Sequence, residues 1–222
     1  MGEIERLHHL FLASNGVCTD TRVLLSGGLF FALRGPNFDA NTFAAEALKH
    51  GCAYAVVDDP TVATDDRFIL VPDTLVALQE LARHHRRSFR VPVIAITGSN
   101  GKTTTKELAH AVLRTSLKTL ATEGNLNNHI GVPLTLLKLK ADHQIAIIEM
   151  GASKPGDIAE LCAIAEPTHG LITNIGKAHL EGFGGLDGVI RTKTELYGWL
   201  RGHEGTAFVH GDDPLLMEKS TR

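Results

Sequence analysis

Short apolar runs separated by polar, glycine-containing turns recur along the chain, and their lengths predict alternating strands and helices. The run over residues 91–97 carries no charge and ends in a threonine, so it predicts a strand buried on both faces, as in parallel sheets. Similar runs at 53–57 and 145–148 predict further buried strands. Over residues 75–82, apolar residues instead recur at a helical spacing. We therefore expect an α/β fold with mostly parallel sheets.

The pattern also predicts two domains, which meet around residues 88–92. We expect a small N-terminal α/β domain over residues 1–88. Over residues 89–222 we expect a mostly parallel, doubly wound sheet, because strands and helices alternate there. The first domain should contain strands at 29–33, 53–57 and 68–71 and helices at 43–48 and 75–82. The second should contain strands at 91–97, 117–121, 145–148, 171–173 and 206–209 and helices after 102, at 157–165 and at 190–200.

A glycine-rich turn follows the strand at 91–97 and precedes a helix in which Leu108, Ala111 and Val112 fall at helical spacing. Glycines let backbone amides converge on an anion, and the helix N-terminus adds partial positive charge. A lysine here can reach the outer phosphates of ATP, and the next threonine can ligate magnesium. The turn consists of Gly98, Ser99, Asn100, Gly101, Lys102, Thr103 and Thr104.

Only two residues separate the glycines of this turn, whereas the common phosphate-binding loop has four, so the motif alone is a weak match. The alternative is a simple glycine turn with a solvated lysine. The buried strand before it and the helix after it favour an ATP site over that alternative.

Polar residues also follow two other predicted strands. Glu149 comes directly after 145–148, and the segment 174–179, which ends in His179, follows 171–173. Ligands of parallel sheets bind beyond the carboxyl ends of the strands, so we expect these residues to meet the glycine-rich turn in one crevice. There Glu149 could hold magnesium directly or through water. Taken singly, Glu149 is equally well an exposed strand end and His179 a polar loop residue.

Composition and charge exclude several classes of protein. The 222 residues are 43% hydrophobic and 21% charged with a net charge of −3, which gives no electrostatic basis for binding nucleic acid or an anionic membrane. Three cysteines stand far apart, as expected of buried thiols in a reducing compartment. The first 15 residues lack the apolar centre of a signal peptide, and no stretch could span a bilayer. We expect a cytoplasmic protein that neither binds nucleic acid nor inserts into membranes.

Three further stretches, taken with the glycine-rich turn, resemble the Mur ligases, the ATP-dependent enzymes that build the peptide stem of bacterial peptidoglycan. They are Gly-Asn-Leu-Asn-Asn-His-Ile-Gly-Val-Pro at 124–133, Glu-Met-Gly-Ala at 149–152, and Asn-Ile-Gly-Lys-Ala-His-Leu-Glu-Gly-Phe-Gly at 174–184. The family has the same short phosphate loop. Within it, the chain is most similar to the member that joins D-alanyl-D-alanine to a UDP-N-acetylmuramoyl-tripeptide.

The resemblance implies a reaction in which ATP converts a carboxylate into an acyl phosphate, which an amine then attacks. Lys102 would contact the β- and γ-phosphates, and Thr103 with Glu149 would hold one Mg²⁺. His179 and Lys193 would serve a second metal ion. Lys193 occupies the position of the lysine that the family carbamylates, although the ordinary place of a helical lysine is an exposed surface.

Two asparagines and the N-terminal domain receive roles in the same way. Asn125 and Asn128 would line the reacting groups. Thr21 and Arg22, in a Thr-Asp-Thr-Arg stretch, resemble the part of the family that grips the UDP end of the substrate. The family often has Asp-Gly-His before an aromatic residue in this domain, whereas this chain has Asp-Ala-Asn at 39–41.

Mur ligases are about twice this length, as three ordinary domains require, so we expect a fragment with an incomplete central domain and no C-terminal domain. Such a fragment should fold without ligating, and it should self-associate through exposed sheet surface. Two other functions stay open. One is a related ligase, such as the Mur enzyme that adds meso-diaminopimelate or lysine, or folylpolyglutamate synthase. The other is a nucleotide-binding module without catalysis.

Overall fold

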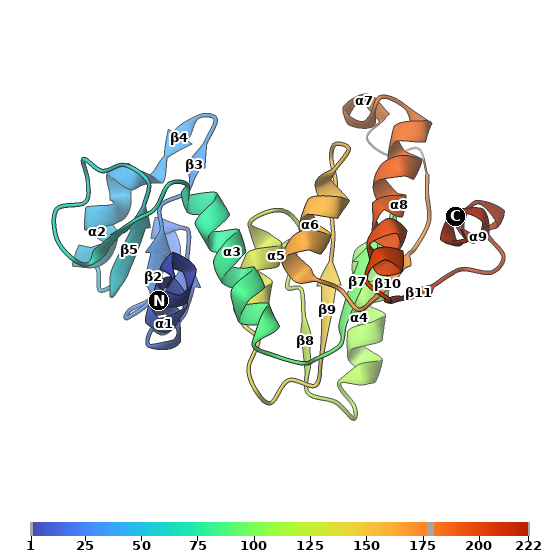
Figure 1. Ribbon diagram of the computed structural model, residues 1–222, viewed down its shortest axis with the longest axis horizontal. Helices are drawn as coiled ribbons and strands as arrows, with labels where there is room; N and C mark the ends of the chain where they lie inside the picture. The colour runs from blue at the N-terminus through green and yellow to red at the C-terminus, as the bar shows by residue number, and fades with distance from the viewer. Residues whose placement is uncertain (1, 177–179, 222) are drawn as a thin grey trace. The chain divides into compact units, whose positions relative to one another are not determined.

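Figure 1 shows the computed structural model of the chain, which describes residues 2–176 and 180–221. The chain forms two compact units, Met1–His85 and Arg86–Arg222, and each has a parallel sheet of its own. The predicted α/β fold with parallel sheets is confirmed. Within the described ranges, none of the helices has the length and apolar character needed to cross a bilayer.

The N-terminal unit is organised around four parallel strands in the order β1-β2-β5-β6. Phe30, Ala44 and Val57 are fully buried in its core, where the strands meet α2. The elements are α1 (Glu3–Leu12), β1 (Val17–Cys18), β2 (Leu29–Phe31), the hairpin of β3 (Arg34–Gly35) and β4 (Phe38–Asp39), α2 (Ala44–Lys49), β5 (Tyr54–Val57), β6 (Phe68–Leu70) and α3 (Thr74–Arg87), with 3₁₀ turns at Thr21–Val23 and Ala40–Phe43.

Four elements of this unit, α1, β1, β3 and β4, were not expected from the sequence. Leu7 and Phe11 form the buried face of α1, and with Ile4 they fall at a helical spacing that the sequence analysis did not use. β1 ends at Cys18, and its sulfur lies 3.9 Å from that of Cys52 although 34 residues separate them. Burial raises the pKa of the Cys52 thiol to about 11, which keeps it protonated at neutral pH.

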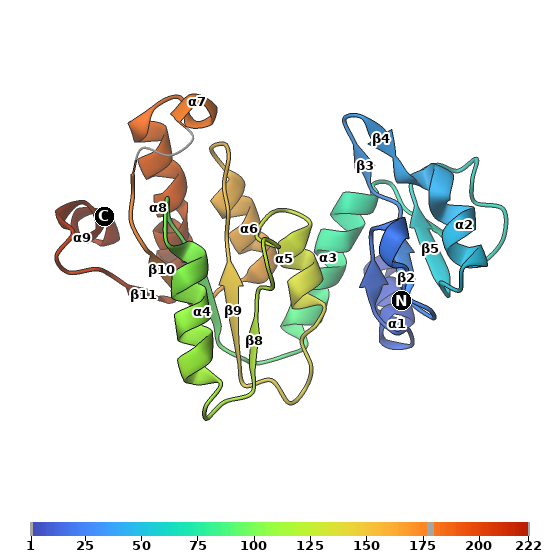
Figure 2. The same ribbon diagram turned by 180° about the vertical axis from the view of Figure 1, so that it is seen from behind.

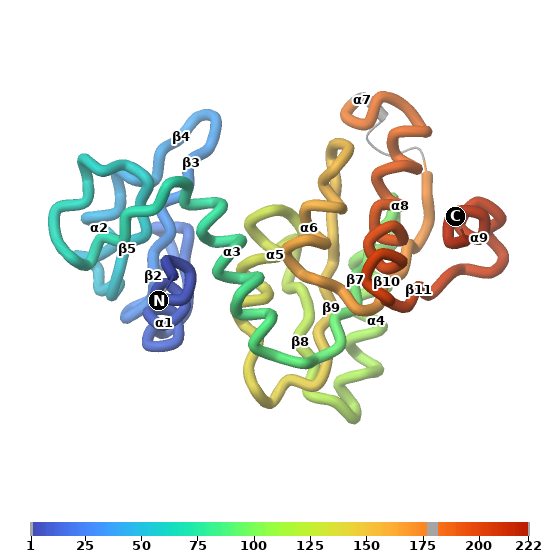
Figure 3. Tube along the Cα trace, in the orientation of Figure 1, coloured from blue at the N-terminus to red at the C-terminus, as the bar shows by residue number. Residues whose placement is uncertain are grey.

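The second unit has five parallel strands in the order β11-β10-β7-β9-β8, with β7 at the centre. α4 lies on one face, against β7, β8 and β9, while α6 and α8 lie together on the other, which makes the sheet doubly wound (Figures 1 and 2). Figure 3 follows the chain from β7 through α4 to the edge strand β8 and back to β9. The strands are β7 (Val93–Thr97), β8 (Thr119–Ala121), β9 (Ile145–Glu149), β10 (His169–Ile172) and β11 (Thr206–Phe208). The helices are α4 (Lys102–Leu113), α5 (Gly131–Leu136), α6 (Asp157–Ala165), α7 (Leu180–Phe183), α8 (Leu186–Gly202) and α9 (Pro214–Ser220).

α4 forms where the sequence predicts a helix, but its apolar residues face away from the sheet. Leu108 and Val112 are 64% and 69% exposed. The side chain buried on the sheet side is Lys106, whose Nζ donates a hydrogen bond of 2.7 Å to the carbonyl oxygen of Thr122. Helical spacing therefore located the helix but does not show which of its faces is buried.

Candidate active site

The glycine-rich turn joins the central strand β7 to α4, and a neighbouring segment of chain holds it in place. Gly98 and Gly101 both have positive φ, at +143° and +78°. The backbone N–H of Ser99 donates to the carbonyl oxygen of Asn174 at 3.0 Å, and that of Asn100 donates to the Asn174 side chain at 3.1 Å. The N–H of Gly176 donates to Ser99 Oγ at 2.9 Å. The loop after β10 thus fixes the turn that follows β7.

Gly98 also has no room for a side chain. A Cβ at this position would overlap Thr173 Oγ1 and would lie 3.1 Å from the carbonyl oxygen of Asn174. Glycine is required here both by its φ and by the close approach of the two loops.

Lys102, the first residue of α4, folds back over the turn. Its Nζ donates to the carbonyl oxygen of Gly98 at 2.9 Å and lies 3.4 Å from that of Ser99. The ammonium group therefore occupies the mouth of the loop, where the phosphates of a nucleotide would meet it.

Glu149, at the carboxyl end of β9, is 1% exposed. Its Oε1 accepts hydrogen bonds from Thr103 Oγ1 at 3.2 Å and Asn127 Nδ2 at 2.8 Å. Its Oε2 is buried and finds no hydrogen-bond partner in the described part of the chain. A buried carboxylate oxygen without a donor is costly unless a cation meets it. Carboxylate and hydroxyl oxygens suit Mg²⁺, so this pair fits a magnesium ion.

The turn opens into a cavity of about 300 Å³ that lies wholly within the second unit. Its polar lining comes from the glycine-rich turn, the segment before α5, the N-terminus of α6, and α8. The lining includes the side chains of Lys102, Asn127, Asn128, His129, Asp157 and Lys193.

Lys193 lies on α8 and is 3% exposed, so it is not the solvated helical lysine that its residue type suggests. Burial, together with the positive charge of Lys102, lowers the pKa of Lys193 to about 8, although Asp157 and Glu195 oppose the shift. Its Nζ stands 5.8 Å from the centre of the Phe183 ring. The Lys193 amine is therefore partly neutral near pH 8, and its neutral form is nucleophilic.

The asparagines expected beside the reacting groups are placed differently from one another. Asn128 lines the cavity, and its Oδ1 accepts from the N–H groups of Ile130 and Gly131 at the start of α5. Asn125 is exposed and is not part of the lining. Asn127, which the sequence analysis did not single out, both lines the cavity and binds Glu149.

Two further predicted residues, Thr21 and Arg22, lie elsewhere, and His179 falls outside the described residues. Thr21 and Arg22 belong to the N-terminal unit, on a 3₁₀ turn capped by Asp20. Arg22 is bound to that aspartate at 2.6 Å, and its hydrogen bonds lower the pKa of Asp20 to about 2. The described structure therefore brings Lys102, Thr103, Glu149 and Lys193 to one site, and leaves the proposed uridine contacts in the other unit.

A glycine-rich turn at the centre of a doubly wound sheet, with lysines and a buried glutamate beside it, is typical of P-loop nucleotide-binding proteins. Residues 96–222, more than half of the chain, match the family model of the Mur ligase middle domain. The chain belongs to the Mur ligase family.

Curated relatives and solved structures agree with this assignment. The chain is 47% identical over 210 residues to the UDP-N-acetylmuramoyl-tripeptide–D-alanyl-D-alanine ligase of Synechocystis sp., covering 94% of this chain and 46% of the relative. It is 43% identical to the Escherichia coli ligase of that name, covering 90% of this chain and 44% of the relative. The chain thus spans about half the length of the curated relatives it matches.

The structural neighbours span the chain in the same way. The crystal structure of MurF from Acinetobacter baumannii superposes with a TM-score of 0.86 at 38% identity, covering 98% of this chain and 50% of that one. MurF from Thermotoga maritima, solved in complex with ADP, gives a TM-score of 0.86 at 36% identity, covering 96% of this chain and 49% of that one.

Proposed function

We propose that the whole protein is an ATP-dependent ligase that joins D-alanyl-D-alanine to a UDP-N-acetylmuramoyl-tripeptide. The observation that carries the proposal is the hydrogen bond from Thr103 to the buried Glu149, next to a cavity that Lys102 and Lys193 line. The names of the similar ligases and the ADP bound to the Thermotoga maritima neighbour support the choice of substrates and of ATP.

The chemistry needs positive charge in one place. A carboxylate of the tripeptide attacks the γ-phosphorus of ATP, the bond to the bridging oxygen breaks, and ADP leaves. The amine of D-alanyl-D-alanine then attacks the acyl phosphate through a tetrahedral intermediate, loses a proton and expels inorganic phosphate. Both the carboxylate and the γ-phosphate are anionic, and Lys102 offsets their repulsion at the mouth of the glycine-rich turn.

Thr103 and Glu149 would hold a Mg²⁺ ion, which neutralises phosphate charge when bound. The chain's own contribution to that site is positioning. Asn127 donates to one oxygen of Glu149, which would leave the other oxygen available to the ion.

We also propose that Lys193 is carbamylated. A buried amine with a pKa near 8 is partly neutral at physiological pH, so it can add to carbon dioxide and release a proton. The product is an anionic carbamate, which could face a second metal ion where an ammonium group could not. We propose His179 as a further ligand of this second metal ion, on the family resemblance alone.

The two parts of the chain would then divide the work. We propose that residues 1–88 bind the UDP end of the substrate, with Thr21 and Arg22 among the contacts, and that residues 89–222 form the ATP-binding part of the central domain. The exposure of the Arg22 side chain leaves it able to meet a ligand.

The test is a ligation assay with the gene product that contains these 222 residues. It is supplied with ATP, Mg²⁺, the UDP-tripeptide and D-alanyl-D-alanine, and phosphate and product are measured together. Amide product formed only with D-alanyl-D-alanine supports the proposal. Product with meso-diaminopimelate, lysine or glutamate in its place indicates a related ligase. Nucleotide binding with no amide product from any amine indicates a non-catalytic module.

For the 222-residue chain alone, we propose nucleotide binding without ligation, because the relatives are about twice as long. We further propose that this chain works in the cytoplasm and self-associates when concentrated. Phe208 on the edge strand β11 is 51% exposed, and Leu108 and Val112 are exposed on α4. Analytical ultracentrifugation over a concentration series tests the association, and a single monomeric species throughout contradicts it.

A further inference from the structure

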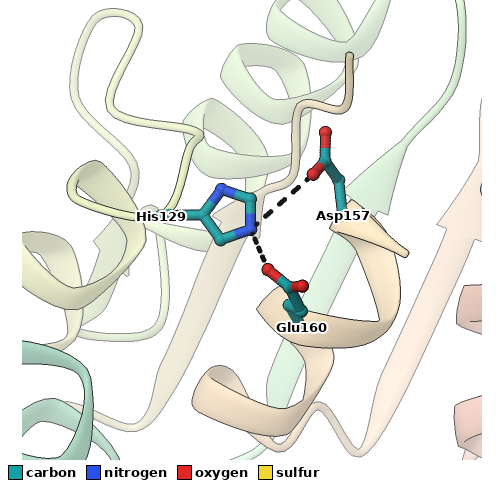
Figure 4. A group of neighbouring side chains, drawn as sticks. All are labelled: His129, Asp157 and Glu160. Carbon is teal, nitrogen blue, oxygen red and sulfur yellow. Dashed lines mark ion pairs between the residues drawn. The ribbon is translucent and has the colours of Figure 1, made fainter. Parts of the chain in front are cut away.

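A histidine and two carboxylates of one helix point towards one another (Figure 4), and the histidine and one of the carboxylates line the cavity. His129 lies in the turn before α5, and Asp157 and Glu160 lie in the first turn of α6. His129 Nε2 is 2.7 Å from Glu160 Oε2 and 3.8 Å from Asp157 Oδ1. One possible ligand atom from each residue falls within 4.8 Å of the other two.

Asp157 has one oxygen fully engaged and one left over. Its Oδ2 accepts from the N–H of Ser153 at 2.7 Å, the hydroxyl of Ser153 at 3.2 Å and the N–H of Lys154 at 3.0 Å. Its Oδ1 is buried, faces His129, and has no hydrogen-bond partner among the residues described. The Asp157 side chain is only 4% exposed, so water does not compensate this oxygen.

The cluster has two carboxylates and one imidazole, and Asp157 also interacts with the charge of the buried Lys193, whose pKa is lowered to about 8, so the cluster's negative charge is only partly balanced. Burial alone would raise the pKa of Asp157, but the hydrogen bonds from Ser153 and Lys154 outweigh it and hold the pKa below its ordinary value. Asp157 and Glu160 are three residues apart on one helix, so two like charges lie on the same face. The N-terminus of α6 offsets part of this repulsion, and a cation between the carboxylates would remove the rest.

We propose that His129, Asp157 and Glu160 bind a divalent metal ion of the Zn²⁺ class. With metal–ligand bonds of about 2.0–2.1 Å, neighbouring ligand atoms in a tetrahedral site lie about 3.3 Å apart. The distances of 2.7 and 3.8 Å from Nε2 to the two oxygens lie on either side of that value. Glu160 has a side chain that is 59% exposed, so it can turn to equalise them. The imidazole ligand favours Zn²⁺ over Mg²⁺.

The environment of the three residues also resembles that of known metal ligands. Ser153 and Lys154 fix the orientation of Asp157 as outer hydrogen-bond donors do in metal sites. His129 and Asp157 line the cavity, so a fourth position would open towards it and could take water or an anionic group of a ligand. The site shares no residue with the Thr103–Glu149 pair.

The test is a zinc titration of the metal-stripped 222-residue chain by calorimetry, without nucleotide and with Mg²⁺ in excess. Because Glu160 is exposed, Glu160→Gln should fold normally, and it should weaken binding at one site by at least about 10-fold. His129→Gln should do the same. Asp212→Asn is the matched control, because Asp212 forms an exposed pair with His210 at 3.9 Å and no third possible ligand groups with them among the described residues. This variant should bind zinc as the parent does.

A spectroscopic reading separates a metal site from a simple ion pair. In the parent, one equivalent of Zn²⁺ should shift the side-chain ¹⁵N signals of His129, which His129→Gln identifies. The proposal is overturned if zinc leaves those signals unmoved, or if parent and Glu160→Gln bind the same number of zinc ions with the same affinity. Neither reading depends on ATP or ligation, so failure here leaves the proposed ligase activity untouched.

Discussion

Asn127 donates a hydrogen bond of 2.8 Å from its amide to Glu149, and the other oxygen of that buried glutamate lacks a donor among the described residues. The amide therefore selects which carboxylate oxygen is available to a cation. Removing it should loosen the glutamate and weaken Mg²⁺-dependent nucleotide binding by about 10-fold, the lower end of what outer-ligand changes cost. Calorimetry of Asn127→Ala with ATP and Mg²⁺ measures this. Asn125→Ala is the comparison, and a larger loss at Asn125 than at Asn127 contradicts the assignment.

Lys102→Ala should lower kcat/KM of the complete gene product. The expected loss of transition-state stabilisation is about 2–4 kcal/mol, the scale of one electrostatic group in an active site. Steady-state ligation kinetics give the value. Lys138→Ala is a suitable control, because Lys138 is an exposed lysine that pairs with Glu123. A kcat/KM of Lys102→Ala within about twofold of the parent value would contradict the role proposed for this lysine.

Gly98 and Gly101 predict two different costs in the same turn. Gly98→Ala combines a φ of +143° with overlap onto Thr173 and should destabilise the second unit by about 2–3 kcal/mol. Gly101→Ala has a φ of +78° and open space around its Cβ, so backbone strain of about 1 kcal/mol is the whole expected effect. Urea unfolding of both variants tests the difference. Equal losses would mean that the approach of the two loops is not what requires glycine at 98.

The N-terminal unit should lose stability in mild acid. His8 Nε2 lies 3.0 Å from His85 Nδ1, and burial together with the charges of His85 and His84 lowers the pKa of His8 to about 4. Unfolded, His8 titrates near 6.5, so between about pH 6.5 and 4 the unfolded chain binds more protons and stability falls as the pH drops.

Melting temperatures at about pH 7.5 and pH 5 test this expectation. His8→Gln should lose part of the pH dependence, whereas His9→Gln, a change at the exposed neighbour, should keep it. An NMR titration that places the midpoint of His8 near its unfolded value of 6.5 contradicts the argument.

The buried parallel strands were predictable because a short, unbroken apolar run is typical of a strand that is buried on both faces. β5, β7 and β9 lie within one or two residues of their expected bounds. The buried face of α4 was not predictable, because the residue that packs against the sheet is Lys106 and the apolar pair Leu108 and Val112 faces outward. The spacing of apolar residues predicts a helix, but it does not show which face of the helix will pack against the sheet.

The candidate site shows the same division. Glycines, a lysine and a threonine in fixed order mark the phosphate loop in the sequence itself. The bond from Asn127 to Glu149 was missed because residues 123–130 form a turn without any period, so nothing in the sequence ranks one asparagine above its neighbours. The burial of Lys193 depends on packing between α6, α7 and α8, which a single helix cannot reveal.

The folded-back Lys102 has a consequence for how a nucleotide enters. Its ammonium group already bonds to the carbonyl oxygens of Gly98 and Ser99, so the resting loop carries its own internal counter-ion. To bind an incoming phosphate, the lysine must give up its hydrogen bonds to these carbonyl oxygens. The loss of those bonds offsets part of the attraction between lysine and phosphate. The exchange frees only carbonyl oxygens, which cannot donate to an anion, and the N–H groups of Ser99 and Asn100 already bond to Asn174. Affinity then depends more on the N–H groups in the first turn of α4 than on net charge. Such a loop should therefore distinguish anions by shape. It should bind a polyphosphate chain more tightly than a compact anion of equal charge.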